Sequence, residues 1–85
     1  MIQMINVIFN GLIRSNHHLK TLQLEANTLG ELMREIRKIK PDITQKEFDQ
    51  AVIFINGNHV RGLRREKKTV HAGDTVIFTN YVGGG

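Results

Sequence analysis

The segment between residues 28 and 41 constrains the fold most, because it predicts one amphipathic helix with a clear start and end. Thr28 and Glu31 have the spacing of a capping box, which satisfies the first N–H groups of a helix. Pro41 disfavours helix at the residue before it. Between these signals lies one apolar stripe at helical spacing: Leu29, Leu32, Met33, Ile36 and Ile39. A single stripe of this kind is buried most readily against a sheet.

The segments around this helix have the composition of β-strands. Residues rich in β-branched and aromatic side chains, or alternating in polarity, favour a pleated structure. We expect strands at residues 2–9, 18–25, 51–55 and 75–79, with shorter pieces at 59–60 and 68–70. The continuous apolar run at 51–55 predicts a strand covered on both faces or nearly so. Asn10-Gly11 predicts a turn that residues 14–18 extend as a polar connection, and the Thr44–Glu47 spacing predicts a second, short helix.

This order of elements predicts an α+β protein, a ubiquitin-like β-grasp. Its mixed sheet of four to five strands has one main helix across one face, and the first and last strands lie side by side in parallel. Ile5, Val7 and Phe9 would then meet the helix. Apolar residues also occupy the opposite parity: Met4, Ile8, Ile53, Ile55 and, in the last strand, either Ile77 or its neighbours. These side chains predict either an exposed binding patch or a surface covered by the stems of Lys20 and Arg61.

The 85 residues suffice for one domain, which we place at 1–82, with 83–85 as a flexible glycine tail. The chain has no cysteine, which excludes disulfides, thiolate zinc sites and a cysteine nucleophile. No segment has the length of a membrane span or the pattern of a leader. We therefore expect a soluble cytoplasmic protein without a membrane partner.

The formal net charge of +4 is concentrated in one segment, which contains Arg61, Arg64, Arg65, Lys67 and Lys68. Such a segment indicates a solvated loop or strand edge, or a contact with an acidic protein partner. Nucleic acid is disfavoured as a partner because no aromatic residues are interleaved with these cations for bases to stack on.

Residues with catalytic potential do not form a convincing internal site. The adjacent His17 and His18 fit an exposed loop better than a metal site, and the remaining histidines lack ligand spacing. Ser15 is the only serine and has no glycine elbow around it. Glu47 and its acidic neighbours fit a solvated helix surface. We therefore expect a protein that is not an enzyme and has no bound metal or cofactor.

The C-terminal run Gly83-Gly84-Gly85 has a different character. Three consecutive glycines cannot contribute to a core and are entropically costly to order. Because glycine has no Cβ, such a segment could enter a narrow channel and carry the terminal carboxylate into a partner's active site. A frayed chain end is the alternative interpretation.

Several motifs together resemble the ThiS/MoaD sulfur-carrier proteins. These are the Asn-Gly turn of Ile55-Asn56-Gly57, the Gly-Asp turn within 72–76, and the terminal Val82-Gly83-Gly84-Gly85. The likeness extends over the whole chain in element order and length. Gly84 and Gly85 match the terminal Gly-Gly of the family, whereas Gly83 stands where another small residue is common.

The resemblance implies the following chemistry. An E1-like enzyme uses ATP to adenylate Gly85, and a sulfur donor converts the adenylate to a thiocarboxylate. The sulfur is then delivered to a biosynthetic enzyme that makes molybdopterin, thiamine thiazole or a related product. Beyond Gly84 and Gly85, we expect partner contacts at Gly83, Val82, Tyr81, Arg61, Arg64 and Arg65.

Two conflicting clues leave the pathway open. Asn80-Tyr81 stands where MoaD-like proteins often have prolines. The segment 41–50, which the shorter thiamine carriers tend to lack, favours MoaD-like length. Two other functions also remain open. One is a ubiquitin-like modifier that forms isopeptide bonds through Gly85, and the other is a basic β-grasp module that binds nucleic acid.

Overall fold

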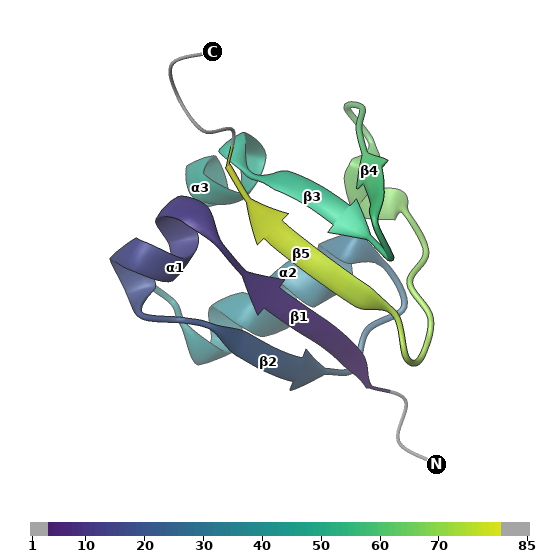
Figure 1. Cartoon of the computed structure of the whole chain (residues 1–85), viewed down its shortest axis with the longest axis horizontal. Coiled ribbons are helices and arrows are strands. Elements are labelled where there is room, and N and C mark those ends of the chain that lie inside the picture. The colour runs from purple at the N-terminus through teal and green to yellow at the C-terminus, as the bar shows by residue number, and fades with distance from the viewer. Residues whose placement is uncertain (1–3, 81–85) are drawn as a thin grey trace.

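A computed structural model describes residues 4–80 of the chain. Its elements, shown in Figure 1, are in chain order β1 (Ile5–Phe9), α1 (Gly11–His17), β2 (Thr21–Leu24), α2 (Leu29–Ile39), α3 (Gln45–Gln50), β3 (Val52–Ile55), β4 (Asn58–Val60), the 3₁₀-helix η1 (Arg65–Lys67) and β5 (Thr75–Thr79).

The strands form one mixed sheet in the order β2-β1-β5-β3-β4. The first and last strands, β1 and β5, are parallel neighbours, and every other pairing is antiparallel. Helix α2 runs across one face of this sheet (Figure 1). The predicted β-grasp fold is therefore confirmed, including its five-stranded form and its central parallel pair.

Helix α2 begins at its predicted cap. The Thr28 hydroxyl accepts the backbone N–H of Glu31 at 3.2 Å. The Glu31 carboxylate binds the N–H of Asn27 at 2.8 Å, one residue before the position that a full capping box would use. Four residues of the apolar stripe are buried, but Ile39, the last residue of the helix, is 48% exposed.

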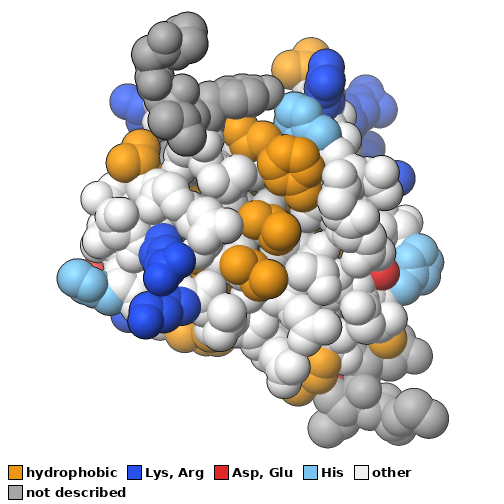
Figure 2. Space-filling view, in the orientation of Figure 1, with side chains coloured by type: hydrophobic (Ala, Val, Ile, Leu, Met, Phe, Trp, Pro, Cys, Tyr) orange, Lys and Arg blue, Asp and Glu red, His pale blue; other side chains and the backbone are white. Residues whose placement is uncertain are grey.

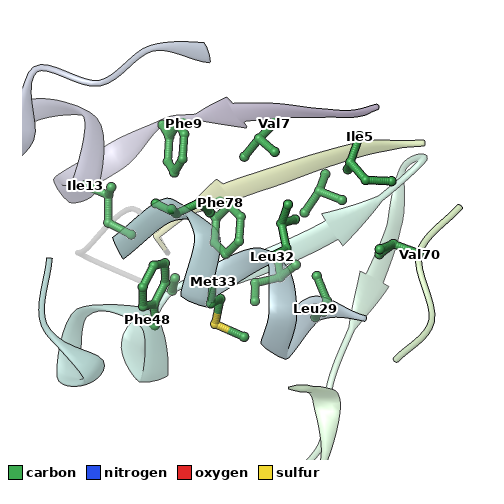
Figure 3. Packing of buried hydrophobic residues seen from close by; sticks show 14 of the residues in the cluster. Ile5, Val7, Phe9, Ile13, Leu29, Leu32, Met33, Phe48, Val70 and Phe78 are labelled. Atoms are coloured by element: carbon green, nitrogen blue, oxygen red, sulfur yellow. The ribbon is translucent and has the colours of Figure 1, made fainter. Parts of the chain in front are cut away.

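The core lies between α2 and the sheet (Figure 3). Ile5, Val7 and Phe9 point into it from β1, as predicted, and are at most 1% exposed. The Phe9 and Phe78 rings stack at a centroid distance of 5.5 Å, and Phe48 of α3 packs against Phe78 at 5.7 Å. Aromatic rings from three elements thus close one end of the core.

The prediction of a loop after β1 is wrong, because residues 11–17 form helix α1. Gly11 has φ +69°, which turns the chain out of the strand, and Ile13 anchors the helix in the core. A Cβ on Gly11 would lie 2.7 Å from Oδ1 of Asn80, which accepts the Leu12 N–H at 2.8 Å. The partner that stabilises the helix start is therefore distant in sequence.

The predicted facing of β3 is also wrong. Ile53 and Ile55 face the core, and Phe54 stands on the opposite face. The error arose because an unbroken apolar run contains no alternation from which to assign parity. The shorter piece predicted at 68–70 makes only an isolated bridge, between Thr69 and Thr28.

Candidate functional site

The face of the sheet opposite α2 carries a row of partly exposed side chains. The strand registers place Ile8 beside Ile77, Ile77 beside Phe54, and Phe54 beside His59. Figure 2 shows hydrophobic side chains in a line over β1, β5 and β3, ending near a histidine with Lys and Arg side chains beyond it. We call Ile8, Ile77, Phe54 and His59 the open-face row.

His59 is positioned by two neighbours. Its ring lies 5.2 Å from the Phe54 ring between centroids, and its Nδ1 accepts the Nε–H of Arg61 at 3.1 Å. Nδ1 is the acceptor in this bond because a guanidinium can only donate. The apolar row therefore ends in a polar group of defined orientation.

The open-face row lies beside the strand from which the C-terminal residues continue. Thr79, the last residue of β5, pairs with Val52, and the next residue of β3, Ile53, pairs with Val60 at the end of β4. Arg61 therefore follows β4 at the same end of the sheet at which β5 finishes. The predicted site residues Tyr81, Val82, Gly83, Gly84 and Gly85 lie outside the described residues and stay predictions.

The cations of the basic segment have different environments. The Arg65 guanidinium donates from Nη1 to the Ala51 carbonyl at 2.7 Å and from Nη2 to the Phe48 and Asp49 carbonyls at 2.5 and 3.3 Å. A cation at the C-terminal end of α3 is also favoured by the helix dipole. Arg64, one residue earlier, is exposed. Arg65 thus stabilises α3, and the partner-binding role expected for Arg61, Arg64 and Arg65 remains a prediction.

The two turns that carried the family resemblance are bonded to each other. The Asn56 side chain donates to Oδ1 of Asp74 and accepts the Thr75 N–H, both at 2.9 Å. Oδ2 of Asp74 accepts the His71 N–H at 2.8 Å. These bonds lower the pKa of the Asp74 carboxyl, first through Asn56 and then through His71. The turn after β3 is thereby tied to the start of β5.

A hydrogen bond between side chains joins helices α1 and α3. Nε2 of His17 lies 2.7 Å from Oε2 of Glu47, and the two side chains are only 11% and 23% exposed. The prediction of a solvent-exposed His17 is therefore wrong, although His18 is exposed. Glu47 also completes the capping box of α3, and its pKa is lowered chiefly by the Thr44 N–H, with His17 adding to the effect.

Two other kinds of site are absent from the part of the chain that the structure describes. Residues 4–80 contain no cluster of three or more His, Asp or Glu side chains placed to bind a metal ion. Within the same range, no helix has the length and apolar character that crossing a membrane requires.

Comparison with known families identifies the group to which this fold belongs. The model of the ThiS family matches residues 7–85, and thus includes the terminal glycines. The chain belongs to the ThiS family. This is a family of ubiquitin-like sulfur carriers, so the resemblance predicted from the turns and the glycines is confirmed.

Solved structures agree in fold. SAMP1 from Haloferax volcanii is 14% identical and superposes with a TM-score of 0.77 over 96% of this chain and 99% of its own. The chain is 21% identical to a protein in the complex of subunits 1 and 2 of molybdopterin-converting factor from Helicobacter pylori 26695, with a TM-score of 0.62 and coverages of 96% and 99%. For the BexX/CysO complex of Amycolatopsis orientalis the identity is 21%, the TM-score 0.73 and the coverages 95% and 99%. No curated protein sequence matches significantly.

Proposed function

We propose that this chain carries sulfur as a thiocarboxylate on Gly85. The observation that carries the proposal is the ThiS-family match through residue 85, on a chain whose final strand ends shortly before the glycines. The protein acts as a substrate for other enzymes. Its own contribution is to present the terminal carboxylate and a surface that partners recognise.

The proposed chemistry has two steps. The Gly85 carboxylate attacks the α-phosphate of ATP on an E1-like enzyme, which forms an acyl-adenylate and releases pyrophosphate. A hydrosulfide equivalent from a sulfur donor then attacks the acyl carbon and expels AMP, which leaves the thiocarboxylate. A biosynthetic enzyme accepts this sulfur in making molybdopterin, thiamine or a related product. The similarity to a protein in the molybdopterin-converting factor complex supports a docking partner of this kind.

The open-face row is the proposed docking surface for the activating enzyme. Ile8, Ile77 and Phe54 form a contiguous apolar strip on a face that no helix within residues 4–80 covers. Apolar strips of this kind on small proteins commonly mark protein contacts. The row crosses β5, the strand that leads toward Gly85, so a partner held there could also reach the C-terminus.

Mass spectrometry tests the carrier chemistry. Incubation with the E1-like enzyme of the same organism, ATP and sulfide should produce the adenylate and then the mass gain of one oxygen replaced by sulfur. A chain that ends at Gly83 should keep its circular dichroism spectrum and thermal midpoint but lose both products. Equal activation of the truncated chain would contradict the proposal, as would the consistent absence of the thiocarboxylate from protein isolated from its source.

Substitution of Ile77 tests the docking surface. Ile77→Asp should lower kcat/KM for adenylation about tenfold, the size expected for a residue near the centre of an interface. Ser15→Asp, which adds the same charge at an exposed position of α1, should change it less than about twofold. Ile77→Thr keeps the β-branched shape and serves if the Asp variant unfolds. Unchanged adenylation in every Ile77 variant that folds would exclude this face.

A second candidate function is protein modification. The solved structure of small archaeal modifier protein 1 from Methanosarcina acetivorans, 16% identical, superposes with a TM-score of 0.74 over 100% of this chain and 99% of its own. A modifier would transfer the activated Gly85 to a lysine amine in place of sulfide. Higher-mass adducts in cell extract that vanish on removal of Gly85 would select this function, and free thiocarboxylate alone would select the carrier.

A further inference from the structure

A groove borders the edge strand β4 on the side away from β3. One wall is β4 with Arg61, and the other is the segment 67–71, which returns toward β5. The groove encloses a volume of about 700 Å³ and is open to solvent. Its lining includes Ile55 and Val60, which belong to the core and expose only 8% and 9% of their surfaces, so the apolar part of the groove is small.

Both walls are held in place by the fold. β4 pairs with β3 over three residue pairs. The opposite wall is bonded to the start of α2, because Lys68 O accepts the Leu29 N–H and Asn27 O accepts the Val70 N–H, each at 2.9 Å. The groove is therefore formed before any ligand enters it, which lowers the entropic cost of binding.

The charge of the groove is positive. Arg61, Lys67 and Lys68 line it, and within residues 4–80 neither lysine has an ion-pair partner. Asp74 is the acidic residue of the lining, and its carboxylate is already bonded to Asn56 and to the His71 N–H. Glu66, the acidic residue of the basic segment, places its Cβ against Gly30 of α2. The three cations of the lining therefore exceed its one carboxylate by two positive charges.

We propose that this groove binds an extended acidic segment of a protein partner. Its carboxylates would pair with Lys67, Lys68 and Arg61, and an aliphatic side chain between them would contact Val60 and Ile55. Single-stranded nucleic acid fits less well, because no Phe, Tyr or Trp among the described residues lines the groove for bases to stack on. The groove meets the open-face row only at His59, and its lining residues lie between positions 55 and 74, so this binding goes beyond carrier chemistry.

Fluorescence anisotropy tests the proposal with a labelled short peptide that alternates glutamate and valine. The peptide should bind the intact chain with an affinity that falls as salt is added. Lys67→Gln with Lys68→Gln should weaken binding about fivefold, as expected for the loss of two exposed ion pairs. Arg34→Gln with Arg37→Gln removes the same charge from exposed positions on α2 and should weaken it less than about twofold. Amide resonances of 58–61 and 67–71 should shift on binding.

Four outcomes would overturn the proposal. They are no detectable binding, equal losses in the two double variants, equal affinity for a peptide with glutamine in place of glutamate, and tighter binding of a single-stranded oligonucleotide of equal charge. A chain that ends at Gly83 should bind the peptide unchanged while losing activation. This variant separates failure of the groove proposal from failure of the carrier proposal.

Discussion

The two faces of the central strand β5 carry similar side chains in opposite settings. Phe78 faces α2, is fully buried and stacks on Phe9, whereas its neighbour Ile77 faces away from the helix and stays partly exposed. One helix can cover only one face of a sheet, so the same apolar composition produces a core on one side and an available surface on the other. Hydrophobicity at neighbouring positions therefore supports stability in one case and recognition in the other.

The largest effect should separate these two faces directly. Phe78→Ala should lower the free energy of unfolding by about 3–5 kcal/mol, because it leaves a cavity that the neighbouring rings cannot move to fill. Ile77→Ala should lower it by about 1 kcal/mol or less, because its side chain is already in contact with water. Urea unfolding followed by circular dichroism measures both changes. Should Phe78→Ala be unfolded throughout, Phe78→Leu provides the milder comparison, and equal losses at positions 77 and 78 would refute the distinction.

An intermediate effect should separate two adjacent arginines. Arg65→Gln should lower the free energy of unfolding by about 1–2 kcal/mol, because a charged donor to the carbonyls at the end of α3 is lost. Arg64→Gln removes the same charge from an exposed position and should change it by less than about 0.5 kcal/mol. The same urea titrations report both values. If Arg64 proved as important as Arg65, the division of the basic segment into structural and exposed cations would fail.

The smallest effect concerns pH. Glu47 has a folded-state pKa below its ordinary value of 4.5, so its charged form stabilises the fold above that value. This contribution is lost as the pH falls below 4.5 and through the lower folded-state pKa. As the pH is lowered, the free energy of unfolding should therefore fall less in Glu47→Gln than in the wild type. The difference should be about 0.5 kcal/mol, as expected for a partly exposed pair. An unaltered pH profile in Glu47→Gln would contradict the role of the carboxylate.

The elements that the sequence predicted well are those specified by near neighbours. Helix α2 was recognisable from Thr28 and its apolar period, and α3 from the Thr44–Glu47 spacing, because a cap and a stripe involve residues a few positions apart. Helix α1 was missed because Asn10-Gly11 resembles a hairpin turn, while the group that accepts the Leu12 N–H belongs to Asn80, 68 residues later. The parity of β3 was missed because its residues are apolar at successive positions.

The candidate site divides in the same way. The terminal glycines and the motifs around Asn56 and Asp74 could be recognised from the sequence, and they identified the family before any contact was known. The sequence did not indicate that Asn56 bonds to Asp74, that His17 pairs with Glu47, or that Arg65 turns inward. None of these contacts produces a local period or a short motif.

The sequence by itself determined the strands, the two capped helices, the β-grasp class and the glycine terminus, because local backbone preferences and hydrophobic periodicity are properties of neighbouring residues. Only the tertiary structure decided which apolar residues of β3 face outward, which cations remain exposed, and that Arg61 and segment 67–71 border one groove. These outcomes depend on strand register and on contacts between distant residues, where packing and hydrogen bonding select one arrangement among several that the local preferences allow.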